Sequence, residues 1–287
     1  MRTNFKPTLD LLEDRTVPAV TLTFSANGYA VFTGDSSKDW VKIDASLDGD
    51  RLLTAQWNGK NGVTKTAVLD LDETPIAGAV VNLKGGDDIF IFRNLDDGFA
   101  VEQSFGLWVD MGNGNDRVIV AQNQNIEGEG TVATLNIQGG SGRDNINVQF
   151  AGNLLGGATL TGTIDGGAHD DNILVAQSGI VDGTVALNIF GSHGNDTIRS
   201  SFFATNPEDE DFFGSVRVNV DGGSGYNSLT LLASADEGAV VDAALNIYAS
   251  SRDGVYFTPG VGIHGPVKAS NWHPFAFHNF VTIPSVI

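Results

Sequence analysis

The sequence predicts an all-β protein, a parallel β-solenoid (β-helix or β-roll-like) with coils of about 27 residues. Three observations lead to this prediction. A glycine-rich run, an acidic residue and an alternating strand recur in that order along most of the chain. The strands that precede these runs also alternate apolar and polar residues. Glycine is abundant, at 36 of 287 residues, without the Gly-X-Y period of collagen, so the glycines indicate many tight turns.

The repeat becomes clear when the units are aligned on the acidic or amide residue that ends each glycine-rich run. Successive members of this column are 48, 29, 28, 27, 25, 31 and 26 residues apart, and we interpret the first gap as holding about two units. An apolar residue follows two positions later in every unit, as Ile146 follows Asp144. The column consists of Asp39, Asp87, Asp116, Asp144, Asp171, Asp196, Asn227 and Asp253.

The strand before each run carries an asparagine flanked by apolar residues, as in "LNIQG" and "LNIFG". This period of two predicts a half-buried strand whose Asn faces outward. Stacked coils would place these Asn side chains ~4.8 Å apart, where amide ladders form. The alternative is an antiparallel β-sandwich in which each turn closes a hairpin. The column contains Asn82, Asn136, Asn188, Asn219 and Asn246, with Trp108 and Thr163 in the two other units.

The glycine-rich runs are interpreted as the corners of the coils. The chain reverses direction there within a few residues, and glycine adopts positive φ without steric cost. The Asp or Asn that ends the run is suited to accept hydrogen bonds from the backbone.

Four regions are expected along the chain. Residues 1–19 form an N-terminal sorting or flexible segment, 20–79 N-terminal β coils, 80–258 the Gly/Asp-rich repeat solenoid, and 259–287 a C-terminal aromatic cap. The cap is inferred from "SNWHPFAFHNF", because the open end of a solenoid needs a cover. The 31-residue spacing is explained by an inserted acidic loop, 205–215.

Composition excludes several classes of function. The chain has 16 Lys and Arg against 35 Asp and Glu, a net charge of -19, so nucleic acid and anionic membrane surfaces are not expected partners, and cations are favoured. No apolar run is long enough to predict a membrane span. Without cysteine, disulfides, thiolate metal sites and cysteine nucleophiles are excluded. No G-x-S-x-G, H-E-x-x-H or phosphate-binding loop occurs, and we expect no enzymatic activity.

The segment "GGSGRDNIN", Gly139 to Asn147, fits the nonapeptide G-G-x-G-x-D-x-U-x and resembles the calcium-binding β-roll repeat of RTX-type (hemolysin-type) proteins. The resemblance implies that aspartates and turn carbonyls of stacked corners hold Ca²⁺ between coils. The other corners match less completely, and the motif occurs once per coil rather than in tandem. The metal-binding residues that it implies are Asp87, Asp116, Asp144, Asp171, Asp196, Gly114 and Gly142.

Electrostatics gives a separate reason to expect cations. Two carboxylates ~4.8 Å apart repel by roughly 0.9 kcal/mol in water and ~3.5 kcal/mol at an effective dielectric constant of 20. A calcium ion between them would remove that cost, and oxygen ligands suit it. In the alternative interpretation, each Asp caps its own turn by accepting backbone N–H bonds. Both interpretations stay open on sequence alone.

The N-terminal stretch "LLEDRTVPA" resembles the LEPR-type motif of large bacterial extracellular proteins, which implies an extracellular or cell-surface location. The expected function is therefore a non-catalytic, extracellular calcium-binding structural or adhesive repeat protein. Extracellular polysaccharide and surface proteins are further candidate partners. The alternatives are a calcium-dependent polysaccharide lyase, with Arg117 and Arg143 as the basic residues of the central corners, and a carbohydrate-binding β-helix that uses Trp40, Trp57 and Trp108.

Overall fold

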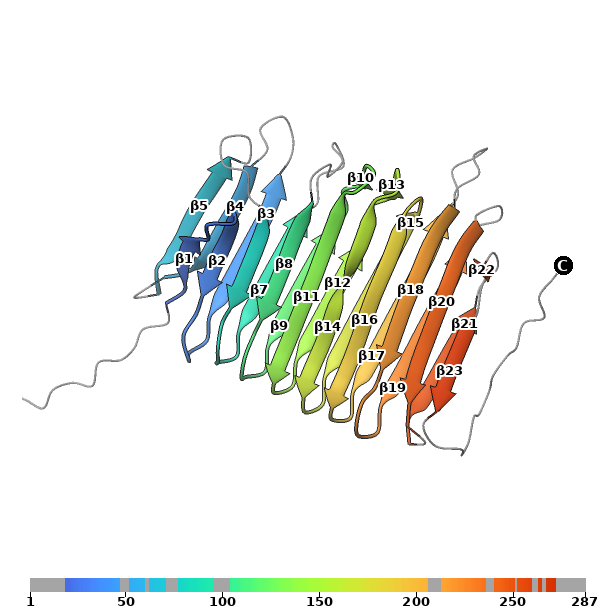
Figure 1. Ribbon diagram of the computed structural model, residues 1–287. Coiled ribbons are helices and arrows are strands. Elements are labelled where there is room, and N and C mark those ends of the chain that lie inside the picture. The colour runs from blue at the N-terminus through green and yellow to red at the C-terminus, as the bar shows by residue number, and fades with distance from the viewer. Residues whose placement is uncertain are drawn as a thin grey trace, which may run out of the picture.

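The computed structural model shows two large β-sheets that lie face to face, and both extend along the length of the solenoid (Figure 1). Within each sheet, strands of successive coils pair in parallel and in register, so the solenoid prediction is confirmed and the sandwich alternative is wrong. The structure describes residues 19–46, 52–59, 62–70, 77–94, 104–205, 213–235, 240–250, 252–259, 263–264 and 267–271.

The first large sheet, sheet A, has the strand order β1-β2-β6-β8-β11-β14-β16-β18-β20-β22, and β23 also pairs with β20. Its strands are β1 (Thr21–Phe24), β2 (Tyr29–Thr33), β6 (Gly78–Asn82), β8 (Phe105–Asp110), β11 (Val132–Ser141), β14 (Thr159–Ala168), β16 (Thr184–His193), β18 (Phe213–Asp221), β20 (Val240–Ala249), β22 (Ile263–His264) and β23 (Val267–Asn271).

The second large sheet, sheet B, has the order β21-β19-β17-β15-β12-β9-β7-β3-β4-β5. Its strands are β3 (Trp40–Ser46), β4 (Leu52–Asn58), β5 (Thr64–Asp70), β7 (Ile89–Asn94), β9 (Arg117–Gln122), β12 (Asn145–Phe150), β15 (Asn172–Ile180), β17 (Thr197–Thr205), β19 (Ser228–Ala235) and β21 (Gly254–Pro259). A small parallel pair, β10 (Ile126–Glu127) and β13 (Leu154–Leu155), lies at the edge opposite the glycine-rich corners (Figure 1).

The N-terminal end differs from the expectation of two units in the first gap. Strands β3 and β7 are direct neighbours in sheet B, so residues 39 and 88 belong to adjacent coils. The intervening chain instead forms β4 and β5, which extend sheet B with antiparallel pairs. Strand β1 likewise adds to sheet A in antiparallel fashion. The strands added directly to the first coil, β1 and β4, therefore run opposite to their neighbours β2 and β3.

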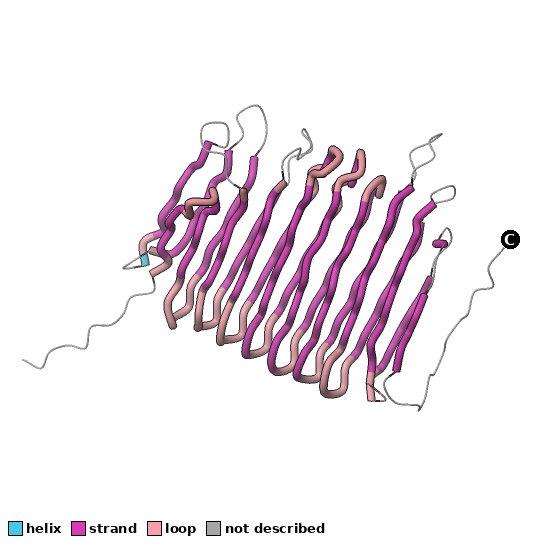
Figure 2. Tube along the Cα trace, viewed as in Figure 1, coloured by secondary structure: helices cyan, strands magenta, loops and turns pink. Residues whose placement is uncertain are grey.

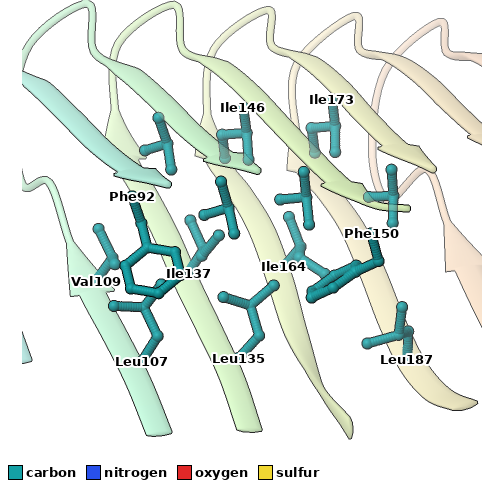
Figure 3. Packing of buried hydrophobic residues seen from close by; sticks show 14 of the residues in the cluster. Phe92, Leu107, Val109, Leu135, Ile137, Ile146, Phe150, Ile164, Ile173 and Leu187 are labelled. Carbon is teal, nitrogen blue, oxygen red and sulfur yellow. The ribbon is translucent and has the colours of Figure 1, made fainter. Parts of the chain in front are cut away.

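The core lies between the two sheets and is built from the inward-facing residue of every second position. Ile137 and Ile164 of sheet A meet Ile146 and Ile173 of sheet B, and all four are fully buried (Figure 3). Phe150 adds an aromatic side chain to the same core layer. Burying such a side chain stabilises the fold by about 1.5–3 kcal/mol, and the stacking of coils supplies this burial because one coil cannot cover its own apolar face.

Each glycine-rich corner contains two residues of positive φ, two positions apart, along the edge of turns in Figure 2. In the fully matched corner they are Gly140 (φ 103°) and Gly142 (φ 135°). Three corners fill one of these positions with another residue, namely Lys84 (φ 70°), His169 (φ 85°) and Ser192 (φ 70°). Corners that depart from the nonapeptide thus keep the same backbone conformation. Their non-glycine residues incur the steric cost of positive φ.

The asparagine ladder is confirmed in the C-terminal half of sheet A. Asn219 donates its amide to Asn188, and Asn246 donates to Asn219, each at 2.7 Å. The predicted place of Asn82 is wrong by two residues, because Val80 pairs with Trp108 and Asn82 pairs with Asp110.

Three predicted features fall outside the described residues: the N-terminal segment through residue 18, most of the acidic insertion and the aromatic residues from 272 onward. In the part of the chain that the structure describes, no helix has the length and apolar character needed to cross a membrane.

Candidate functional site: the aspartate column at the corners

A column of buried acidic side chains joins the coils at the glycine-rich corners. We call it the inner column. The backbone N–H of each member donates to Oδ1 of the member in the next coil, as Asp116 donates to Asp144 at 2.8 Å and Asp144 to Asp171 at 2.8 Å. The inner column consists of Asp39, Asp88, Asp116, Asp144, Asp171, Asp196, Asn227 and Asp253, linked by such bonds of 2.6–2.9 Å.

The sequence alignment placed Asp87 in this column, and the structure places Asp88 there instead. Asp88 is buried and Asp87 is exposed. The corner that contains them has full length, because Lys84 and Gly86 occupy the two positive-φ positions. Phe90, not Ile89, therefore matches the apolar position of Val118.

Asp87 belongs to a second, exposed column that consists of Asp87, Asn115, Arg143, Asp170, Asn195 and Tyr226, the residues just before inner-column members. We call it the outer column. Its hydrogen bonds run in the opposite direction, since the N–H of the later coil donates to the earlier side chain. Asn115 N–H donates to Asp87 at 2.9 Å, and this bond lowers the pKa of Asp87. Inner-column bonds thus join all successive corners between Asp87 and Tyr226. Outer-column bonds to a backbone N–H join the same corners, except at the step from Arg143 to Asp170. Between those two residues, the Arg143 guanidinium pairs with the Asp170 carboxylate at 3.1 Å.

Where the run begins with glycine, that glycine makes room for the inner carboxylate. A Cβ built on Gly139 would lie 2.5 Å from Asp144 Oδ2 and 2.5 Å from the Gly166 carbonyl oxygen. Gly166 and Gly191 stand in the same relation to Asp171 and Asp196. Glycine in these runs therefore has two roles: it allows positive φ at the second and fourth positions, and in the corners that begin with glycine it leaves room at the first.

Five inner carboxylates share an electrostatic cost. Oδ2 of Asp88, Asp116, Asp144, Asp171 and Asp196 is buried without a hydrogen-bond partner in the described structure. Burial is the main cause that raises their pKa values, to about 7, 7, 6, 8 and 6 in that order. The N–H bond to Oδ1 opposes the shift in each case but does not cancel it. A proton or a cation on Oδ2 would relieve this cost.

The predicted metal set fits calcium incompletely. Among the described residues, no group of three or more His, Asp or Glu side chains is arranged to hold one ion, whereas Ca²⁺ takes six to eight oxygen ligands. Each of the five coils from Asp88 to Asp196 offers a single inner carboxylate oxygen without a hydrogen bond, because Oδ1 accepts a backbone N–H. Gly114 and Gly142 stack directly, since a Cβ on Gly142 would overlap the Gly114 carbonyl oxygen. The two glycines thus serve close packing between coils.

The basic residues of the central corners are both exposed. Arg143 pairs with Asp170 across one coil step, with 72% of its side chain exposed. Arg117 pairs in register with Ile89 and Asn145 on the outward face of sheet B. Neither contacts an inner carboxylate, because those lie inside the corner.

Sequence reasoning missed the outer column and the inward direction of the acidic side chains. A signal for the latter was present: in five corners a glycine stands five residues before the inner-column member, as Gly139 precedes Asp144. Comparisons with protein-family models, curated proteins and solved structures found no match for this chain.

Proposed function

We propose that this chain is a non-catalytic structural repeat protein, an extracellular or cell-surface module that acts as a rigid spacer or adhesive element. The observation that carries the proposal is the continuity of the inner column. Seven successive hydrogen bonds join its eight members from Asp39 to Asp253. Side chains that an enzyme would keep free for a substrate here accept hydrogen bonds from the backbone of the preceding coil.

The acidic surface supports a module that works outside a nucleic-acid or membrane context, since its net charge is -19. The extracellular assignment depends on the N-terminal resemblance to LEPR-type motifs. It is a part of the proposal that fractionation of producing cells tests directly.

Calcium enters the proposal as a counter-ion of the corners. The atoms that would bind it are the free Oδ2 oxygens of the inner column, together with turn carbonyls. Calcium would neutralise buried charge there and tie adjacent coils together. Calcium competes with protons at these side chains, because each Oδ2 atom can bind either a proton or the calcium ion.

A modular spacer predicts a specific tolerance to shortening. Deleting 145–196 joins Asp144 to Thr197, and these ends fit because Asn145, Asn172 and Thr197 share one register position. We expect a folded, cooperatively melting protein that is shorter by two coils, about 10 Å, in small-angle X-ray scattering. A control deletion of 145–183, which breaks the register, should not fold. Failure of the in-register deletion to fold would contradict modularity.

The lyase alternative is tested by incubation with polygalacturonate and alginate in calcium. We expect no unsaturated product by absorbance. Product formation that Arg117→Ala or Arg143→Ala abolishes would replace the structural proposal with the enzymatic one.

A further inference from the structure

A groove of about 400 Å³ lies on the outward face of sheet A, across β6, β8, β11 and β14. Its lining combines one large aromatic ring with short polar side chains, and it is made by two neighbouring columns of outward residues. One column runs Val80–Trp108–Asn136–Thr163, and the other Asn82–Asp110–Gln138. The groove is thus part of the regular sheet surface, hollowed where its side chains are small.

Glycine sets the position of the aromatic ring. The Trp108 indole lies back over Gly106, on the same strand, in the space that a Cβ of Gly106 would fill. Tyr29 meets the indole edge-on, with ring centroids 5.2 Å apart and planes at 89°. Tyr29, Gly78 and Gly106 share one register position, so two glycines leave the room in which these rings meet. The indole is thereby held flat along the sheet as one wall of the groove.

The polar side chains of the groove have no hydrogen-bond partner in the part of the protein that the structure describes. No hydrogen bond of the Asn82, Asp110, Asn136 or Gln138 side chain is found among the described residues. Farther along the same two columns the polar side chains do have hydrogen-bond partners within the protein. In the first column Asn188, Asn219 and Asn246 form the amide ladder, and in the second Asp165 accepts from Oγ of Ser192, a corner residue of the next coil, at 2.7 Å. Asn136 is excluded from the ladder because its neighbours are Trp108 and Thr163.

We propose that this groove binds an uncharged polysaccharide chain. The indole provides a flat apolar surface for the C–H face of a sugar ring. The free amides both donate and accept, and Asp110 accepts, which suits hydroxyl groups. No described lining residue is basic, and the protein carries a net charge of -19, so anionic polysaccharides are disfavoured. Sites of this kind join apolar contact area to a few placed polar groups.

The test uses the full chain in isothermal titration calorimetry with cellohexaose, xylohexaose and mannohexaose, and with hexagalacturonic acid as the charged comparison. We expect at least one neutral hexasaccharide to bind with a Kd in the millimolar range or below, and the charged one at least tenfold more weakly. Trp108→Ala should weaken binding at least tenfold, and Asn136→Ala several-fold.

Matched controls separate the groove from general effects. Trp40→Ala removes an indole from the outward face of sheet B, and Asn219→Ala removes an amide from the Trp108 column outside the groove; both should bind like the wild type. Gly106→Ala keeps Trp108 but displaces its ring, and should weaken binding while the melting curve stays cooperative. The proposal is overturned if no neutral hexasaccharide binds, if hexagalacturonic acid binds best, or if folded Trp108→Ala and Gly106→Ala proteins bind as tightly as the wild type.

Discussion

Asp116 donates its backbone N–H to Oδ1 of Asp144 in the next coil, and Asp144 keeps its other carboxylate oxygen, Oδ2, buried without a hydrogen-bond partner in the described structure. One oxygen therefore joins two coils, and the other determines the protonation of the side chain. Asp88, Asp116, Asp171 and Asp196 repeat both features, so the fold links its stability to the charge of this column.

Stability should fall as pH rises from about 4 to about 8. The folded-state pKa values of Asp116 and Asp171 are raised to about 7 and about 8, while unfolded Asp titrates near 3.9. In this window the folded state binds more protons than the unfolded state. The stability that these carboxyl groups contribute is therefore complete below about pH 4 and is lost as pH rises through their folded-state pKa values. The smallest of the raised pKa values, about 6 for Asp144 and Asp196, already lies about two units above the unfolded value, and this difference on one residue corresponds to about 3 kcal/mol. We therefore expect Tm to fall by roughly 6 °C or more.

The control for this pH dependence is the triple variant Asp116→Asn, Asp144→Asn and Asp171→Asn, which removes three titrating groups of the inner column. Calorimetric melts of the variant in calcium-free buffer should show a flatter dependence of Tm on pH. Equal slopes for variant and wild type would mean that these carboxylates do not control the effect.

Substitution of Asp144 should separate its two oxygens. Asp144→Ala removes the acceptor for the buried Asp116 N–H, and we expect a loss of about 1–3 kcal/mol. Asp144→Asn keeps Oδ1 and removes the charge, so at about pH 8 without calcium it should match or exceed the wild-type Tm. Asn227 already fills this position in the column and accepts from Asp196 at 2.8 Å. Urea unfolding of both variants measures these differences. An Asn variant as unstable as the Ala variant would refute the interpretation that the inner column is most stable when its side chains are uncharged.

The fold was predictable because the repeat is regular in both sheets. Glycines mark the corners, and apolar residues at every second position mark the strands, as at Ile146 and Val148. The alignment failed only in the corner of Asp88, where Leu83 and Lys84 stand in place of the first two glycines. Lys84 adopts positive φ there regardless, because the neighbouring coils impose the corner conformation.

The site was less predictable, for reasons of side-chain direction. The sequence marks Asp144 as a turn residue, but an acceptor of backbone N–H groups can face inward or outward. Among the six corners with two positive-φ residues, those of Asp88 and Asp116 place the buried Leu83 and Met111 where the other four have the first glycine, which hides that clue. The groove depends on the Trp108 ring lying over Gly106. A single side-chain conformation of this kind produces no repeating pattern in the sequence, so it could not be predicted.

Glycine at the first position of the run should be more sensitive than glycine at a neighbouring position. Gly139→Ala places a methyl group 2.5 Å from both Asp144 Oδ2 and the Gly166 carbonyl oxygen, and such crowding in a packed interior costs about 1–3 kcal/mol. Gly85→Ala is the matched control, because its nearest contact would be 3.4 Å and its φ is not positive. Thermal melts should show a clear loss for Gly139→Ala and little change for Gly85→Ala. Similar losses in both would show that any corner side chain is rejected.

Calcium should stabilise the protein in a pH-dependent manner if it binds the inner column. At about pH 8 the Oδ2 atoms of Asp144 and Asp196, whose pKa values are about 6, are ionised and available to a cation. At about pH 5 protons occupy them. Ca²⁺ at 100 times its Kd adds about 2.7 kcal/mol to the folded state, so Tm should rise with millimolar Ca²⁺ at about pH 8 and change little at about pH 5. Mg²⁺ should have less effect, since it holds its waters and demands octahedral geometry. Asp144→Asn should reduce the calcium response while retaining the hydrogen bond from Asp116. An unchanged Tm in calcium at about pH 8 would leave protons as the counter-ion of the column and refute the calcium prediction.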